Sequence, residues 1–440
     1  MKRIQIILFS FVLIIGTGMN GFALSTDSPE EKKWSLSDLY QRALDFSETI
    51  KIAEKELIVA EKDKDRAFAV LVPRFTAYGG YKRYQEDKIE IPESAWSYGA
   101  RFDQSFTLNG KELIALGMAE DQIAKTGMDL NDLREFILFQ VAAGYFDILK
   151  AIKRKEIAQT NVSRMETHKD AVLVQLKLEN APKTELYRTE ATLSGYKTEL
   201  VIAENNVFLS RARLMRLVDL PENFRIRVPE TLSEGMVEHN IEELKQSALS
   251  DREDLKSLKM SQKISESNIR FSKGAYWPTL SIEGGYEAME SKPDFFTLDE
   301  DMLFVGAKVS FPLYDGGLRS AELGQARVRS KQAELKVKDR SKKVSLEVET
   351  AYRNLITIES LIASVNDKLK SAEANYEAIM IQFKTGMADS LDVIDANALL
   401  ADAERELIEA KYRLSLTFLK LQKARGIFLS NITEKYNLKM

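Results

Sequence analysis

The chain carries the same pattern twice, and this duplication limits the folds open to it more than any single motif does. Residues 70–81 read VLVPRFTAYGGY, and residues 275–286 read AYWPTLSIEGGY. Their prolines, Pro73 and Pro278, lie 278 − 73 = 205 residues apart. A period of that length is too long for one repeat of a solenoid, so it indicates a duplicated domain.

Each copy is predicted to combine two β-strands with a hairpin of long helices. The first copy covers residues 34–228, with strands at about 73–84 and 95–106 and a helical turn at about 179–184. The second copy covers residues 236–430, with strands at about 278–289 and 302–312 and a helical turn at about 386–390. Shorter helices, roughly 37–71 and 241–275, are predicted to lead into the first strand of each copy.

The long helices carry an apolar seam with steps that alternate between four and three residues. In the second copy the seam consists of Val344, Val348, Ala351, Leu355, Ile358, Ile362, Val365, Leu369, Ala372, Tyr376, Ile379 and Phe383. The first copy keeps the same spacing but places Lys155 and Lys169 in the seam. A strict repeat of this kind predicts left-handed supercoiling against a neighbouring helix. A helix from Gly316 to Phe383 would reach on the order of 100 Å at ~1.5 Å per residue, too long for one globular core.

The strand at 95–106 alternates clearly between two kinds of side chain. Trp96, Tyr98 and Phe102 lie on one face, while Arg101 and Asp103 lie on the other. An aromatic face opposite a charged face is typical of strands in an outer-membrane barrel. Four strands cannot close a barrel, and open sheet edges are not tolerated in lipid. The pattern therefore predicts closure by several chains, the alternative being hairpins packed on the helices of a soluble protein.

The first 23 residues are predicted to be a secretory signal peptide. Lys2 and Arg3 precede an apolar run from Ile4 to Ile15, which is shorter than the ~20 residues that span a bilayer. The chain has no cysteine, which excludes a lipobox, disulfides and thiolate chemistry. The net charge of −4 argues against a nucleic-acid partner.

Neither a catalytic set nor a metal or cofactor site is predicted from these residues. The two histidines, His168 and His239, lie far apart in the sequence and are expected to be solvated surface residues. We therefore expect no enzymatic activity.

From about Trp34 to Phe428 the chain resembles the outer membrane efflux protein family, the TolC-like trimeric exit ducts of bacteria. Residues 386–396, GMADSLDVIDA, and 311–319, FPLYDGGLR, carry the likeness. The resemblance implies a mainly α fold with membrane β-hairpins, a TolC-like α/β barrel with long coiled-coil helical hairpins. A homotrimer would close a 12-stranded β-barrel in the outer membrane and extend a helical tunnel into the periplasm.

The family likeness also implies a function and partners. The chain would be the passive exit duct of a tripartite efflux or type I secretion system. A periplasmic adaptor (membrane fusion protein) and an inner-membrane transporter would deliver its substrates. The alternative is a periplasmic coiled-coil structural or tethering protein without a pore. The exported substrate is not indicated by the sequence.

Two aspartates, Asp392 and Asp395, lie three residues apart just after the second helical turn, and hence on one face of a helix. The resemblance places them at the periplasmic pore entrance, with Glu185 as their counterpart in the first copy. Rings of carboxylates at such a constriction favour cations. The alternative is an ordinary solvated helix face whose acids interact with the helix dipole.

Two further groups of residues are expected to have roles in the duct. The tip turns, predicted for adaptor docking, contain Pro182, Gly386, Met387, Ala388 and Ser390. The predicted barrel lumen contains Arg101, Asp103, Glu283 and Lys308, although such residues would also simply solvate a water-filled channel.

Phe383 and Ala388 stand where better-known members have the Tyr and Arg that hold the entrance closed. Neither can donate a hydrogen bond to Glu185. Either Lys183 or Lys384 substitutes for them, or heptad packing alone holds the entrance.

Overall fold

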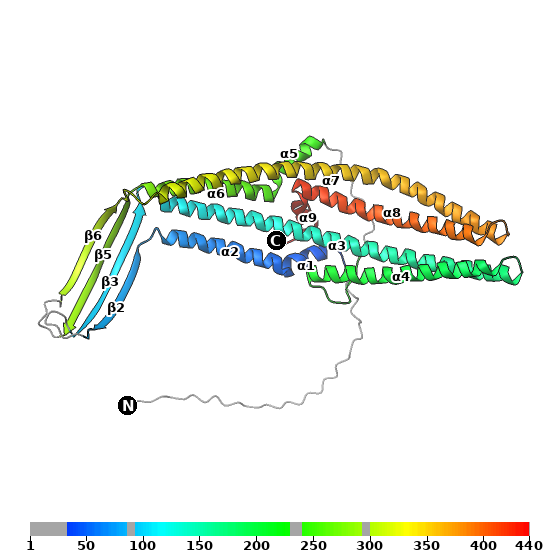
Figure 1. Cartoon of the computed structure of the whole chain (residues 1–440), viewed down its shortest axis with the longest axis horizontal. Helices are drawn as coiled ribbons and strands as arrows, with labels where there is room; N and C mark the ends of the chain where they lie inside the picture. The colour runs from blue at the N-terminus through cyan, green and yellow to red at the C-terminus, as the bar shows by residue number, and fades with distance from the viewer. Residues whose placement is uncertain (1–32, 86–92, 229–239, 293–299, 440) are drawn as a thin grey trace, which may run out of the picture.

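The structure is a computed structural model that describes residues 33–85, 93–228, 240–292 and 300–439. Long helices form most of the molecule, and a four-stranded sheet projects from one end of them (Figure 1). The predicted signal peptide, His239 and residues 229–238 lie outside the described residues.

The helices repeat in length as well as in sequence. The long helices α3 (Lys111–Lys177) and α7 (Leu318–Lys384) each have 67 residues, while the return helices α4 (Lys183–Val218) and α8 (Ser390–Arg425) each have 36. They form two hairpins whose tips lie at the end of the molecule opposite the sheet (Figure 1). The remaining helices are α1 (Leu36–Phe46), α2 (Glu48–Ala69), α5 (Ile241–Asp251), α6 (Glu253–Lys273), the 3₁₀ turn η1 (Gly274–Tyr276) and α9 (Phe428–Tyr436).

The predicted heptad seam is confirmed by burial over its whole length, from Val344 to Phe383 on α7. Eight of its members are buried and the other four are half-buried. In the first copy, the two seam lysines form ion pairs with α4: Lys155 with Glu204 at 3.0 Å and Lys169 with Glu190 at 2.8 Å. Their ammonium groups therefore reach the edge of the seam while their stems cover it.

None of the described helices has the length and apolarity to cross a bilayer.

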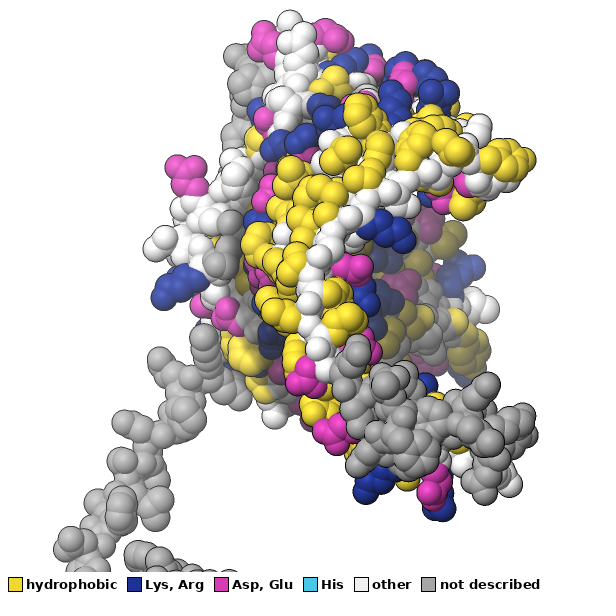
Figure 2. All heavy atoms as spheres, turned by 90° about the vertical axis from the view of Figure 1, so that its left-hand side faces the viewer, with side chains coloured by type: hydrophobic (Ala, Val, Ile, Leu, Met, Phe, Trp, Pro, Cys, Tyr) yellow, Lys and Arg dark blue, Asp and Glu magenta, His cyan; other side chains and the backbone are white. Residues whose placement is uncertain are grey.

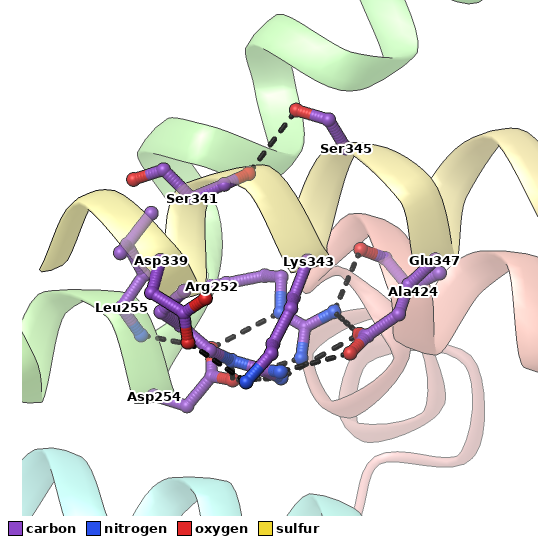
Figure 3. A network of polar contacts seen from close by, with 10 residues as sticks. Arg252, Asp254, Leu255, Asp339, Ser341, Lys343, Ser345, Glu347 and Ala424 are labelled. Carbon is purple, nitrogen blue, oxygen red and sulfur yellow. Dashed lines mark hydrogen bonds and ion pairs between the residues drawn. The ribbon is translucent and has the colours of Figure 1, made fainter. Parts of the chain in front are cut away.

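Two helices predicted to be continuous are each broken once. Ser47 separates α1 from α2 with ψ 116°, and Arg252 separates α5 from α6 with ψ 125°. The second break is held by the Arg252 guanidinium, which donates hydrogen bonds to Asp254, Glu347 and the carbonyl oxygen of Ala424 (Figure 3). Two helices from other parts of the sequence, α7 and α8, are thereby tied to this junction, and no local sequence pattern predicts it.

The sheet joins the two copies side by side. Its strands β2 (Arg74–Arg83), β3 (Ser94–Thr107), β5 (Thr279–Lys292) and β6 (Glu300–Ser310) are antiparallel in the order β2-β3-β5-β6. Because β5 extends to Lys292 and β6 begins at Glu300, the loop expected over 290–301 is shorter than predicted. A short parallel pair, β1 (Lys33–Trp34) with β4 (Arg225–Ile226), was not predicted.

Candidate functional site

Both hairpin tips end in the same backbone motif. At the second tip, the amide of Met387 donates to the carbonyl of Gln382 at 2.8 Å, and Gly386 takes a left-handed φ of 74°. At the first tip, Asn180 donates to Gln175 at 3.0 Å, and Glu179 takes the left-handed conformation with φ 60°. This arrangement satisfies the last carbonyls of each long helix and reverses the chain.

The two predicted entrance aspartates are both exposed, but their local roles differ. Asp392 accepts a hydrogen bond from the amide of Asp389 at 3.0 Å, which completes a capping box at the start of α8. Asp392 therefore stabilises the helix N-terminus, as the alternative interpretation expected. Asp395 lies one turn later on the surface of α8. The carboxylate of Asp395 is therefore in contact with solvent.

Glu185 lies near these acids, at the start of α4. Burial, and secondarily the negative charge of Asp389, raises the pKa of its carboxyl group above the usual value. Glu185 therefore lies close enough to Asp389 of the other hairpin for their charges to interact. The shared region is the tip surface on which the entrance residues were predicted.

The five predicted tip-turn residues do not share one environment. Met387 is 72% exposed and Pro182 and Gly386 are also exposed, whereas Ala388 is half-buried. Ser390 is fully buried. It therefore has no surface to offer a docking partner, because its hydroxyl faces the other hairpin.

The prediction that His168 is a solvated surface residue is wrong. His168 is 0% exposed, and its Nε2 lies 2.8 Å from the hydroxyl of Ser390. Its ring also meets Phe383 edge to face, with the centroids 4.8 Å apart. Burial lowers the pKa of His168 from 6.5 to about 4, so the imidazole is neutral at pH 7.

A signal for this burial was present in the sequence. His168 lies three residues after Met165 and four before Val172, both members of the apolar seam. A position between two seam residues borders the buried side of the helix. The surface prediction for His168 was wrong because it relied on the residue type alone.

Lys183 and Lys384, the predicted substitutes for the Tyr and Arg that hold the entrance closed in better-known members, are both exposed.

At the other end of the molecule, the strand register sorts the sheet into two faces. Phe75 pairs with Phe102, Gly284 lies opposite Phe102 on the next strand, and Val305 lies opposite Gly284. The remaining large hydrophobic side chains of this face are Tyr81, Trp96, Tyr98, Phe106, Leu280, Ile282, Tyr286, Leu303 and Val309. Figure 2, a view from the sheet end, shows hydrophobic side chains gathered in a band over the strands.

The four predicted lumen residues lie together on the opposite face. Asp103 pairs in register with Glu283, and Lys308 lies two strands away on the same face. Arg101 forms an ion pair with Glu283, and Arg74 forms one with Asp103 at 3.3 Å. This face is therefore charged but locally neutralised.

Comparisons with known proteins agree with this geometry. A profile of the outer membrane efflux protein family matches residues 244–426. Outer membrane protein TolC of Vibrio cholerae is 22% identical over 417 residues, which cover 92% of this chain and 93% of that protein. Outer membrane protein TolC of Escherichia coli is 21% identical, over 94% of this chain and 85% of that protein.

The solved structures show the same fold. The Campylobacter jejuni CmeC outer membrane channel superimposes with a TM-score of 0.81 at 16% identity, over 92% of this chain and 90% of that chain. The outer-membrane channel OprN gives a TM-score of 0.80 at 16% identity, over 89% of each chain. The duplicated hairpins and the two-faced sheet therefore have the fold of these outer membrane channels, and residues 244–426 match the outer membrane efflux protein family.

Proposed function

We propose that this chain is the passive outer-membrane exit duct of a tripartite efflux or type I secretion system. Three copies would close a 12-stranded barrel and a helical tunnel, and a periplasmic adaptor with an inner-membrane transporter would supply substrate and energy. The chain itself would carry out no catalysis.

The exposure of the apolar sheet face is the observation that carries this proposal. Phe75 is 79% exposed, Leu303 81% and Val305 78%, so this face does not pack on the chain's own helices. A contiguous apolar face of this kind is stable only against lipid or a partner. This exposure argues against the periplasmic tether without a pore, in which the hairpins would cover their aromatic side.

The sheet edges support assembly of several chains. Among the described residues, β2 and β6 are the outer strands, and each has one edge without a strand partner. Unpaired edges in lipid are costly, since no water satisfies their backbone groups. Pairing of β6 with β2 of a second copy would satisfy both edges, and a third copy would close the ring.

The assembly is tested with full-length protein extracted from outer membranes in detergent. Chemical cross-linking should give trimers, and the same material in planar bilayers should give discrete conductance steps. A monomer that stays soluble without detergent would contradict the proposal.

The entrance assignment predicts a change in ion selectivity. Replacing Asp395 by Asn should lower the ratio of cation to anion permeability by roughly two-fold or more, because the ring at the narrow mouth loses three charges. Asp395 is a cleaner test than Asp392, which also caps α8. The matched control is Asp367→Asn. Asp367 is also exposed but lies on α7, more than four helical turns before the tip, so this change should leave the permeability ratio unchanged. Equal ratios in wild type and Asp395→Asn would rule out the ring.

A further inference from the structure

A cavity of about 440 Å³ lies between the ends of the chain and the long helices. Its lining residues fall within four separate parts of the sequence, 35–40, 145–146, 227–228 and 414–436, and we call it the midway cavity. Figure 1 places α1 and α9, which form part of its wall, about midway between the sheet and the hairpin tips. Pockets that hold drug-sized molecules have volumes of roughly 300–1,000 Å³, so the midway cavity is large enough for a small ligand.

The wall of the midway cavity is mostly apolar and rich in aromatic rings. Ten of its seventeen lining residues are aliphatic or aromatic, and the aromatic ones are Tyr40, Tyr145, Phe146, Phe418 and Tyr436. Ordered water in a cavity needs two to four polar partners for each molecule, which such a wall does not provide. Aromatic rings instead pack well against the edge or face of another ring. The wall therefore suits a flat apolar molecule better than it suits solvent.

The charged side chains of the lining all have the same sign. They are Arg227 and Lys435, and the described residues that line the cavity include no aspartate or glutamate. Arg227 and Lys435 are exposed, whereas Tyr40 and Tyr145 are buried. The positive charges therefore lie on the open side of the cavity and the rings on its closed side. This arrangement complements a molecule that has an anionic group at one end of an apolar body.

The backbone of Arg227 is fixed on both sides. Its amide donates a hydrogen bond to the carbonyl oxygen of Trp34 at 2.9 Å, and its carbonyl oxygen accepts one from the Tyr145 hydroxyl at 2.5 Å. Burial raises the pKa of Tyr145 to about 12, and the positive charge of Arg227 opposes this rise. The Tyr145 phenol is therefore a neutral donor at pH 7, and the guanidinium lies close to it. Among the described residues, no acid forms an ion pair with the Arg227 side chain.

We propose that the midway cavity binds a small aromatic carboxylate, with its rings against Phe146 and Phe418 and its carboxylate on the Arg227 guanidinium. The planar guanidinium matches a carboxylate through two parallel hydrogen bonds. This inference goes beyond the duct function, because that function assigns no ligand to this part of the chain.

A ligand in the midway cavity would join parts of the chain that lie far apart in the sequence. Helices α1 and α9 lie near the two ends of the chain, while α3 belongs to the first hairpin and α8 to the second. Only the folded chain brings these helices together, so a ligand that contacts all of them stabilises the folded state.

Equilibrium dialysis of the full-length protein in lipid nanodiscs measures the binding with three soluble probes. Naphthylacetate is an aromatic carboxylate, naphthylacetamide lacks the charge, and naphthylmethylammonium reverses it. Naphthylacetate should bind saturably in the micromolar range. The other two probes should bind at least ten-fold more weakly, since roughly this factor is lost with one hydrogen bond to a charged group.

A matched pair of arginines tests the anionic end of the site. Arg227 lines the cavity, whereas Arg413 is equally classed as exposed and precedes the lining residue Leu414 on α8 without lining the cavity itself. Arg227→Gln should weaken the binding of naphthylacetate by roughly ten-fold. Arg413→Gln should bind it as wild type does.

Thermal unfolding gives a second measurement. Naphthylacetate should raise the melting temperature of wild type and of Arg413→Gln, and should raise that of Arg227→Gln much less. The naphthylmethylammonium probe should leave the melting temperature of all three proteins unchanged.

The binding site is overturned if wild type shows no saturable binding of naphthylacetate, if the three probes bind equally, or if Arg227→Gln and Arg413→Gln have equal affinities. Dialysis does not depend on conductance. A failure of the binding site therefore leaves the duct function intact, and wild-type protein that binds naphthylacetate but forms no channels would contradict the duct function alone.

Discussion

The imidazole of His168 contacts Phe383 of α7 and Ser390 of α8, and its Nδ1 has no hydrogen-bond partner among the described residues. The Ser390 hydroxyl that it contacts belongs to a helix more than two hundred residues away in the sequence. The chemistry of the residue is therefore set by its tertiary surroundings. Its neutrality at pH 7 follows from them.

This burial predicts a pH-dependent stability. Burial lowers the pKa of folded His168 to about 4, below the 6.5 of the unfolded chain, so the unfolded state binds the proton first as the pH falls. The stabilisation is complete above pH 6.5 and is lost progressively towards pH 4, by about 2 kcal/mol at pH 5.

The measurement is the thermal stability of wild type and His168→Gln at pH 8 and pH 5. Subtracting the variant removes the contribution of all other titrating groups. The difference between the two proteins should shrink at pH 5. A difference that is the same at both pH values would mean that His168 titrates normally.

The ends of the helices depend on glycines in different environments. Gly386 and Gly426 both take a left-handed φ, of 74° and 76°. A Cβ on Gly386 would meet nothing within 4 Å, whereas one on Gly426 would lie 2.8 Å from the backbone of Arg252, at the junction of α5 and α6. The tip turn therefore needs only a permissive backbone, while the end of α8 also needs the absence of a side chain.

Alanine at each position separates these two requirements. Gly386→Ala should destabilise by about 1 kcal/mol, the cost of the left-handed conformation. Gly426→Ala should destabilise by roughly 3 kcal/mol or more, because the α5–α6 junction must also shift. Thermal denaturation of both variants measures the effect. Equal losses of unfolding free energy in the two variants would show that the end of α8 and the α5–α6 junction can shift apart at no cost.

At the scale of the whole molecule, the two faces of the sheet decide where the protein resides. Val305 and Gly306 are neighbours on β6 but belong to opposite faces, since Val305 lies opposite Gly284 and Gly306 opposite Glu283. In the proposed barrel, Val305 faces lipid and Gly306 faces the lumen.

Adding one charge to each face tests the orientation. Val305→Lys should cost about 2–4 kcal/mol per subunit on insertion and sharply lower the yield of outer-membrane trimers. Gly306→Lys should leave the yield close to wild type, since the lumen face already carries charge. The yield is measured by quantitative blotting of outer-membrane fractions. A lower yield of trimers for Gly306→Lys than for Val305→Lys would mean that the Gly306 face, and not the Val305 face, meets lipid.

The sequence by itself determined the elements of this protein. Heptad spacing predicts which side of α7 is buried, and alternation predicts the two faces of the strands, because position along the chain maps directly onto a face of a helix or strand. The duplication and the family segments predicted two hairpins and an exit duct.

Only the tertiary structure decided where a helix is broken and which polar side chains are buried. The break at Arg252 and the burial of His168 and Ser390 depend on contacts between segments far apart in the sequence, such as the 222 residues that separate His168 from Ser390. Polar side chains are ordinarily solvated, so residue type alone points them outward. Whether a polar group is buried depends on the presence of a matching partner, and that partner is supplied only when the two hairpins pack together.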